Sequence, residues 1–348
     1  MAEAALKNIP ELTPIYGEKA TDVAVDNGYA DQKVAYWATD ENGNRVIAEL
    51  LLPSRAQMGA INISIDGKSA GVYEIDGDAW TVGKDVTEPE SIRGEKYAYS
   101  ELNTVLVTHS LIAAGFAGKN LRIATGLPFD HYYRNGEVNQ ELINKVKESL
   151  KVPVLPKGGF LSANLIGHEL YPESTAAFVD YAVDDQTGEM KSEIETGLAV
   201  VDIGGNTTDI TYINSDNMIN VQRSGSRKLG VLNVRDRLRR LIQEDFKVDE
   251  LRDAQLDRAL RTGHCKIFGK DQAVQKQIDA AKRESVKKLM NYVEEMVGDA
   301  ADLDMVLFVG GGAEVLGDVI KEYPHARVPD RPQFSNARGM LKYMTFVR

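Results

Sequence analysis

The chain has 348 residues, of which 43% are hydrophobic and 27% are charged, so it is long enough to bury a full core and favours two domains over one. Lys and Arg total 41 against 52 Asp and Glu; the resulting charge of −11 argues against non-specific nucleic-acid binding. The single cysteine, Cys265, excludes an internal disulfide and a zinc cluster and favours a structural thiol in a reducing compartment. No signal-peptide pattern opens the sequence, and no segment reaches the roughly 20 apolar residues that span a bilayer. We therefore expect a cytoplasmic protein without membrane contact.

The first half of the chain changes from strand-like alternation to helical periodicity and back. Alternating apolar residues separated by Asn-Gly and Asp-Gly pairs are typical of antiparallel strands, whereas a 3.6-residue apolar period indicates a helix. The expected elements are strands over 22–53 and 61–85 with turns at Asn42-Gly43, Asp66-Gly67 and Asp76-Gly77, a helix over 99–115 that stops at Gly115, a strand over 121–127 ended by Pro128, an amphipathic helix over 139–150 and a short helix over 173–182.

A polar, glycine-bearing stretch over 184–197 is a plausible domain boundary, and the pattern of elements restarts beyond it. Mixed strands and helices throughout predict an α/β protein. The expected elements of the second half are a strand–turn–strand unit over 198–213, helices over 230–245 and 249–262, one long charged helix over 271–297, a strand, glycine turn and helix over 304–323, and a C-terminal helix near 336–344.

The sequence contains an internal echo. VAVDNGYADQKV and LAVVDIGGNTTDI share an apolar strand, an aspartate and a glycine two positions later, and Lys33 and Asp209 each follow their aspartate by seven residues. Two such units suggest two related halves that face one ligand.

Both echoed turns suit a polyphosphate. Glycine has no Cβ, so the backbone can approach a bulky anion and point its amide N–H groups at it, while hydroxyl and amide side chains add donors and a lysine adds a point charge. The candidate phosphate ligands are Asn27, Gly28, Lys33, Gly204, Gly205, Asn206, Thr207 and Thr208.

Asp26 and Asp202 each end a strand just before its turn. Bare carboxylates would repel phosphate, so a hard cation must lie between them, and Mg²⁺ held largely through its waters is the expected arrangement. The alternative is that each aspartate only caps a hairpin turn, but the matched pair favours the metal role.

Three further features are weaker taken alone. Gly310, Gly311 and Gly312 follow a continuous apolar strand and open a helix, a junction that lets the backbone pack against a base or ribose, although it matches neither the Walker loop nor GxGxxG. Glu173, in LYPESTAAF, is placed to polarise a water for attack on a terminal phosphorus, or else it is only an acid favoured by the helix dipole. The charged stretch RESVKKLMNYVEEM favours a half-exposed helix, whose basic residues could still reach a ribose.

The order of these motifs resembles the actin-like ATPase superfamily, which includes actin, the Hsp70 chaperones and the sugar kinases. The segments YSELNTVLVTHSLIAAGF and LRIATGLPFDHYYRNG resemble, more narrowly, the ParM/StbA branch of plasmid-segregation actins, and the similarity covers roughly residues 22–346. The departures are Tyr29, Ala30 and Asp31, where relatives often place small hydroxyl residues.

The resemblance implies an actin-like, ribonuclease H-like duplicated fold of two domains with a central nucleotide cleft. It implies an N-terminal extension over 1–21, a first domain over 22–190 to which 325–348 return, and a second over 191–324. In that family the phosphate-1 motif corresponds to Asp26, Asn27, Gly28 and Lys33, the phosphate-2 motif to Asp202 through Asp209, the adenosine motif to Gly310, Gly311, Gly312 and Glu314, and the water-preparing position to Glu173.

The function implied is ATP hydrolysis coupled to polymerisation, with ATP and Mg²⁺ bound and Asp26 and Asp202 as candidate metal ligands. Filaments of the family segregate plasmids through a small DNA-binding adaptor on a centromere-like site, and the acidic charge of this chain agrees with DNA contact delegated to such a partner. Two alternatives remain: a small-molecule kinase of the same superfold, and a non-catalytic actin-like scaffold.

Overall fold

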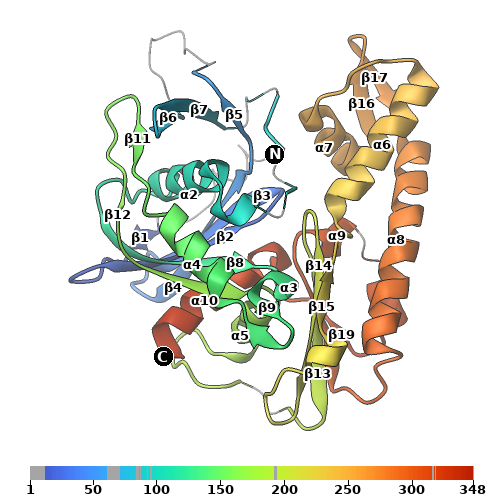
Figure 1. Cartoon of the computed structure of the whole chain (residues 1–348). Coiled ribbons are helices and arrows are strands. Elements are labelled where there is room, and N and C mark those ends of the chain that lie inside the picture. Colours follow the sequence, from blue (N-terminus) through green and yellow to red (C-terminus); the bar gives the residue numbers. More distant parts are fainter. Residues whose placement is uncertain are drawn as a thin grey trace. The chain divides into compact units, whose positions relative to one another are not determined.

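The computed structural model describes residues 12–60, 71–83, 86, 88–91, 93–94, 96–191, 194–315, 317 and 319–347. The chain forms two compact units, one of Met1–Glu193 with Phe334–Arg348 and one of Ile194–Gln333 (Figure 1). Residues 325–333, which we expected to return to the first domain, therefore lie in the second unit, because the short strand β19 (Ala326–Arg327) pairs with a strand of that unit. The expected turn at Asp66-Gly67 lies outside the described residues.

The main sheet of the first unit has the strand order β1-β3-β2-β8-β12, with β4 also paired to β3. Strands β2, β3 and β4 are antiparallel neighbours, and β8 and β12 continue the sheet parallel to β2. The strands are β1 (Thr13–Pro14), β2 (Thr21–Asn27), β3 (Asp31–Thr39), β4 (Arg45–Pro53), β8 (Asn120–Leu127) and β12 (Asn164–Pro172). Residues of the N-terminal extension thus join this sheet, since β1 pairs with β3.

Helices cover both faces of this sheet because successive side chains of its strands point to opposite faces and both sets include apolar residues. Val23 and Val25 face a core that includes Leu111 of α2 (Glu101–Ala113), whereas Ala24 faces Met340 of the C-terminal helix. Ser100 caps α2, and Gly115, at φ +88°, follows its end as expected. The second face is covered by α5 (Thr175–Ala182) and α10 (Ser335–Phe346).

Smaller elements complete the first unit. A four-stranded sheet has the order β11-β6-β7-β5, and its β6–β7 hairpin turns at Asp76-Gly77 as predicted. The remaining elements are β5 (Ala56–Met58), β6 (Val72–Ile75), β7 (Asp78–Val82), the 3-10 helix η2 (Tyr97–Tyr99), α3 (Phe129–Tyr132), β9 (Tyr133–Arg134), β10 (Glu137–Val138), α4 (Gln140–Ser149) and β11 (Val154–Pro156).

The main sheet of the second unit repeats this topology. Its order is β15-β14-β13-β18-β19, again with an antiparallel first hairpin and two later strands parallel to its first strand. The duplication suggested by the internal echo is therefore present in the fold. The strands are β13 (Gly197–Ile203), β14 (Thr208–Asn214), β15 (Gly225–Arg227) and β18 (Met305–Val309), with β19 as above.

The helices of the second unit pack on one face of this sheet, where Val201 meets Leu238 of α6 (Val231–Phe246) and Val293 of α8 (Gln275–Val297). The expected helix over 271–297 begins only at Gln275, because Lys270–Ala273 form strand β17 against β16 (His264–Ile267). Cys265 lies buried in this core, as a structural thiol should. The remaining elements are η3 (Val221–Arg223), α7 (Asp253–Thr262), α9 (Gly312–Val315), η4 (Ile320–Glu322) and η5 (Pro332–Phe334). Over the described part of the chain, no helix has the length and apolar character needed to cross a bilayer.

Candidate functional site

The β2–β3 turn of the first unit brings Asp26 and Lys33 together. The two residues are direct partners in the strand pair, and the Lys33 Nζ lies 3.1 Å from an Asp26 carboxylate oxygen. Gly28 lies beneath this ion pair, because a Cβ at that position would come within 2.7 Å of the Lys33 Nζ and 2.9 Å of the Asp31 carbonyl oxygen. The turn therefore combines a buried carboxylate, a cation and a backbone that requires glycine.

Two residues that the sequence analysis did not single out brace this turn. The Ser54 hydroxyl donates to the Gly28 carbonyl over 2.7 Å, and the buried Gln32 amide donates to Ser54 over 2.9 Å and to Tyr97 over 3.1 Å. No motif marks either residue, although Gln32 immediately precedes Lys33. Their hydrogen bonds fix the direction of the Gly28 peptide before any ligand binds.

The Asn27 side chain forms hydrogen bonds to two neighbouring elements of the first unit. Its amide donates to Asn103 of α2 over 3.0 Å, and its carbonyl oxygen accepts from the Gly126 N–H of β8 over 3.2 Å. Asn27 therefore ties the end of β2 to its neighbours α2 and β8.

Glu173 lies at the same edge of the first sheet. It directly follows β12, and its N–H donates to the Leu127 carbonyl at the end of β8 over 2.8 Å. A Cβ on Gly126 would lie 3.1 Å from a Glu173 carboxylate oxygen, so the missing side chain of Gly126 makes room for the glutamate. Because β2, β8 and β12 are parallel, their carboxyl ends bring Asp26 and Glu173 to one edge, where open α/β sheets bind their ligands.

The chain turns sharply between Glu173 and α5. Ser174 is fully buried at φ +57° and ψ −46°, and the Thr175 N–H donates to the Glu173 carbonyl over 2.5 Å, which is the form of the rare γ-turn with positive φ. The Asn336 side chain of α10 accepts the Ser174 N–H over 3.0 Å. A residue from the C-terminal helix thus holds the strained turn that follows Glu173.

Helix α10 is itself anchored by buried charges. Arg338 forms ion pairs with Glu49 at 3.0 Å and with Asp180 of α5 at 2.7 Å, and Lys342 reaches Asp180 at 3.1 Å. The side chains of this network are at most 11% exposed. Loss of one ion pair would leave a buried charge without its partner, which is costly. The network therefore fixes the position of Asn336 relative to α5.

In the second unit the β13–β14 pair places two acids opposite each other. Asp202 and Asp209 are direct partners in the pair, and both are buried, at 3% and 1% exposure. Ser226 donates its hydroxyl to an Asp209 carboxylate oxygen. Side chains of direct cross-strand partners lie on the same face of a sheet, so the two carboxylates face the same side.

The turn between these strands supports the start of α6. The N–H groups of Val231 and Leu232 donate to the carbonyls of Gly204 and Gly205 over 3.2 and 2.9 Å. A Cβ on Gly230 would come within 2.2 Å of the Gly205 carbonyl oxygen, so glycine is required where the helix meets the turn. The Thr208 hydroxyl donates to the Leu229 carbonyl, which gives it a structural role.

The glycine cluster after β18 lies against the end of β13. Gly310 has φ +82°, and a Cβ there would lie 2.3 Å from an Asp202 carboxylate oxygen; a Cβ on Gly312 would lie equally close to the Ile203 side chain. Gly311 is exposed, and a Cβ on it would meet only Gln333 at 3.7 Å. Gly310 and Gly312 therefore permit close packing against β13, and Gly311 presents open backbone.

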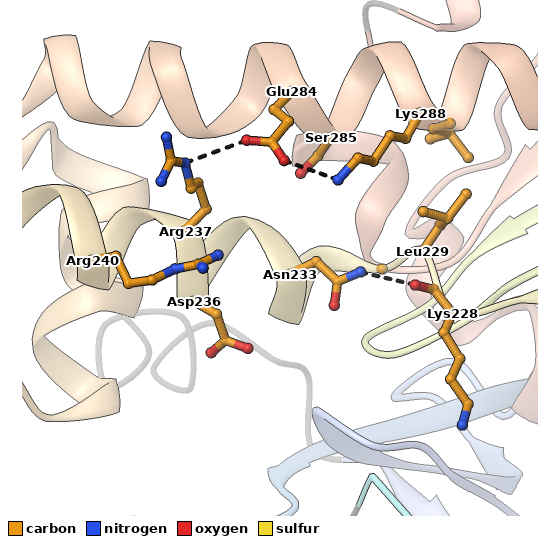
Figure 2. Close-up of a pocket in the computed structure, with 11 residues that line it drawn as sticks. Lys228, Leu229, Asn233, Asp236, Arg237, Arg240, Glu284, Ser285 and Lys288 are labelled. Carbon is orange, nitrogen blue, oxygen red and sulfur yellow. Dashed lines mark hydrogen bonds and ion pairs between the residues drawn. The ribbon is translucent and has the colours of Figure 1, made fainter.

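A cavity of about 270 Å³ opens between α6 and α8 next to the Gly205 turn (Figure 2). Figure 2 shows Glu284 of α8 between two cations: its carboxylate lies 3.3 Å from the Arg237 Nε and 2.9 Å from the Lys288 Nζ. This part of α8 was expected to be a half-exposed helix whose basic residues could reach a ribose, whereas no pattern in the sequence indicated Arg237. The residues that line the cavity are Lys228, Leu229, Gly230, Asn233, Asp236, Arg237, Arg240, Glu284, Ser285, Lys288 and Leu289.

Within each unit the structure brings the predicted residues together. The first gathers Asp26, Asn27, Gly28, Lys33 and Glu173 at one sheet edge. The second gathers the β13–β14 turn, the three glycines and the cavity at the corresponding edge. Asn206 and Thr207 are buried in that turn, and Glu314 lies in α9.

Sequence models of known families match most of the chain. The model of the N-terminal part of the plasmid segregation protein ParM matches residues 21–184, and the model of the C-terminal part of archaeal MreB-like actin homologues matches residues 200–322. No curated protein has a significant match to this sequence.

Solved structures match over nearly the whole length. The ADP complex of the archaeal actin homologue Ta0583 is 21% identical, with 93% of this chain and 99% of that chain covered and a TM-score of 0.71. A subunit of a 15-stranded ParM filament from Clostridium botulinum is 20% identical, with 94% and 99% covered and a TM-score of 0.70. ParM from Bacillus thuringiensis with AMPPNP is 15% identical, with 95% and 99% covered and a TM-score of 0.63.

The repeated sheet topology and these matches define an actin-like fold. The first part of the chain is thus similar to the N-terminal part of ParM, the second part is similar to the C-terminal part of archaeal MreB-like actin homologues, and the chain as a whole has the actin-like fold.

Proposed function

We propose that this protein is a cytoplasmic, filament-forming ATPase that binds Mg-ATP, polymerises in the ATP state and disassembles after hydrolysis. The observation that carries the proposal is the pair of equivalent hairpins, each with a buried aspartate at its first strand end and glycines in or beside its turn. In both units the turn lies at the edge where the parallel strands end, as nucleotide sites of open α/β sheets do.

Each of the two turns offers backbone N–H groups that would bind phosphate oxygens. Gly28 is already oriented by Ser54 and Gln32, so little ordering entropy is lost on binding. Lys33 adds a positive charge, and Asn206 and Thr207 add side-chain donors in the second turn. Asn27 and Thr208 contribute through their backbone, since their side chains are engaged in the fold.

The base and ribose occupy the cavity between α6 and α8. It adjoins the Gly205 turn through Gly230, and its ion pairs between Glu284, Arg237 and Lys288 provide donors and acceptors for ribose hydroxyls and ring nitrogens. The exposed backbone of Gly311 belongs to the same unit and offers a flat surface to the nucleoside.

The donor set fits Mg²⁺, which prefers carboxylate and water oxygens and would neutralise charge on the phosphates. Asp202 and Asp209 lie opposite each other on one face of the β13–β14 pair and are both buried, so the second unit supplies the main metal ligand, Asp202.

Glu173 orients the water that attacks the γ-phosphorus. Its carboxylate lies over Gly126, and the backbone on either side is held by Leu127 and Asn336. Phosphoryl transfer depends chiefly on positioning and on stabilising charge, so a fixed carboxylate suits this role. Assembly that closes the site would raise the rate by bringing this water into line.

The biological role we propose is plasmid segregation. A match to the ParM N-terminal model and the fold of a ParM filament subunit support self-assembly. The net charge of −11 disfavours direct DNA contact, so the filament end would bind a small DNA-binding adaptor on a centromere-like site.

The test is light scattering, phosphate release and electron microscopy of the purified chain with Mg-ATP, Mg-ADP or no nucleotide. We expect filaments and phosphate release with Mg-ATP only. Particles that stay small with Mg-ATP would point to a kinase, and filaments without phosphate release would point to a scaffold.

Two variants separate the roles in this site. Glu173→Ala should bind ATP and assemble but release phosphate at least about a hundredfold more slowly. Asp202→Ala should lose Mg-dependent nucleotide affinity in calorimetry. Unchanged hydrolysis in the first variant or unchanged affinity in the second would remove that residue from the mechanism.

A further inference from the structure

The cavity between α6 and α8 holds more positive charge than a neutral nucleoside requires. The Glu284 carboxylate lies 3.3 Å from the Arg237 Nε and 2.9 Å from the Lys288 Nζ. Arg240, roughly one turn further along α6, also lines the cavity, and its charge acts on the same carboxylate. Three cations thus surround one acid, which leaves a local surplus of two positive charges at this place.

The other charged residues of the lining do not neutralise this surplus. Asp236, the second acid of the lining, pairs with Arg239 at 3.1 Å, and Figure 2 shows its carboxylate pointing away from Glu284. The Lys228 side chain extends away from α8 in the same view. The chain as a whole carries a net charge of −11, so a cavity with surplus positive charge is a local exception. A cleft lined by one sign of charge attracts a ligand of the opposite sign.

The cations and the acid suit different parts of such a ligand. A hydrogen bond from Lys288 lowers the pKa of Glu284, and the charges of Lys288, Arg237 and Arg240 lower it further. Glu284 is therefore ionised at neutral pH and accepts hydrogen bonds from hydroxyl groups. Guanidinium groups donate in a planar fork that matches phosphate oxygens, and such charge-assisted bonds are about twice as strong as bonds to neutral acceptors.

The two arginines lie beside the nucleoside part of the site. Helix α6 begins at Val231, whose N–H donates to the Gly204 carbonyl in the turn that would bind the 5′-phosphates. At about 1.5 Å per residue, Arg237 and Arg240 follow Val231 by roughly 9 and 14 Å along the helix axis. An anion held there is therefore separate from the 5′-phosphates.

In dinucleotide-binding folds a carboxylate accepts a ribose hydroxyl, and a nearby arginine accommodates a phosphate on the ribose. We propose that this cavity binds nucleotides with a second phosphate on the 2′- or 3′-hydroxyl of the ribose, held by Arg237, Arg240 and Lys288. Glu284 accepts from the ribose hydroxyl that stays free. This inference rests on the proposed nucleotide site and names a second class of ligand for it. Because both classes occupy the same cavity, such a nucleotide competes with ATP.

The first test compares three ligands that share adenosine and a 5′-phosphate. AMP, adenosine 3′,5′-bisphosphate and adenosine 2′,5′-bisphosphate are each used to displace ADP from the full chain in calorimetry. At least one bisphosphate should bind about tenfold or more tightly than AMP, because its ribose phosphate gains charge-assisted hydrogen bonds. The tighter of the two identifies the hydroxyl that carries the phosphate. Equal affinities for all three ligands would overturn the proposal.

The second test measures how the cations contribute to this discrimination. Arg240→Gln should lower the ratio of bisphosphate affinity to AMP affinity by about fivefold or more, whereas Arg240→Lys, which keeps the charge, should retain part of it. The matched control is Arg261→Gln, which removes the same charge from an exposed arginine of α7 outside the cavity lining and should keep the wild-type ratio. A wild-type ratio in Arg240→Gln would contradict the proposal.

The binding data also separate this inference from the proposed function. Failure of ADP to bind would refute the proposed function, whereas normal ADP binding with no preference for a bisphosphate would refute this inference alone. If ADP does not bind, direct titration of the two bisphosphates decides the inference. Binding that Arg240→Gln weakens would support it, and absence of binding would overturn it.

Discussion

Asp209 lies directly opposite Asp202 in the β13–β14 pair, at the position that Lys33 holds opposite Asp26 in the β2–β3 pair. Each unit thus contains a hairpin of this kind, but the residue opposite the aspartate is Lys33 in the first unit and Asp209 in the second. The first hairpin neutralises its aspartate internally, with an N–O distance of 3.1 Å. The second places two buried acids on one face, an arrangement that a bound cation would stabilise.

Asp209→Asn tests whether this second acid serves the metal. The variant keeps an oxygen that can accept from Ser226 but removes one negative charge beside Asp202. We expect the affinity for Mg-ATP to fall about tenfold, while the metal-free protein becomes more stable by up to about 1 kcal/mol because like charges no longer face each other. Calorimetry with and without Mg²⁺ and urea unfolding measure the two effects. Unchanged affinity would assign Asp209 to holding the turn alone.

Adjacent glycines provide a second prediction with an internal control. Gly310→Ala should destabilise the protein by at least about 2 kcal/mol, because alanine is disfavoured at φ +82° and its Cβ would meet the Asp202 carboxylate at 2.3 Å. Gly311→Ala has only an ordinary contact with Gln333 and should change stability by no more than about 0.5 kcal/mol. Thermal unfolding of both variants distinguishes them. If Gly311 also faces the nucleoside, its variant alone will fold normally yet bind ATP more weakly.

The sequence predicted the parts of this site that are local. Strand alternation, the aspartate at each strand end and the following glycines all lie within about a dozen residues, so the duplicated hairpins were visible as an internal echo. The strand Lys270–Ala273 was missed because its polar residues suit a helix start, and only pairing with His264–Ile267 makes it a strand.

The residues that complete the site lacked such local signals. Arg237 of α6 reaches Glu284 of α8 only because the two helices pack together, and Ser54 reaches Gly28 only through the pairing of β4 with β3. Asn336 is still further along the chain from the turn at Ser174 that it holds. Contacts of this kind depend on the three-dimensional arrangement and leave no pattern in a single sequence.

Asn336→Ala should impair hydrolysis more than binding. Its loss leaves the buried Ser174 N–H without this acceptor and frees the strained turn after Glu173, so we expect the kcat for phosphate release to fall about tenfold or more with little change in KM. Stability should fall by about 1–3 kcal/mol. A drop in stability with an unchanged kcat would show that Asn336 is structural only.

The double variant Asn336→Ala/Ser174→Gly supplies the control. Glycine adopts positive φ readily, so it should form the turn without help and restore part of the lost kcat. No recovery of kcat would mean that Asn336 acts on the site by a route other than this turn.

His168 predicts how stability responds to acid. It lies in β12, where burial and the nearby Lys147 lower its pKa to about 3, and its Nδ1 has no hydrogen-bond partner among the described residues. As the pH falls from about 6.5 to 3, His168 therefore takes up a proton in the unfolded chain, where its pKa is about 6.5, but stays neutral in the folded chain. The contribution of His168 to the free energy of unfolding should thus be fully present above about pH 6.5 and decrease below it, by up to about 1.36 kcal/mol per pH unit. Burial lowers the pKa of His109 to about 4, so it adds to the same trend.

In urea unfolding between about pH 7 and pH 5, His168→Gln should show a shallower decline than the wild type, because glutamine does not titrate and can still bond to Thr125. Equal slopes in the two proteins would exclude His168 as a source of the acid sensitivity.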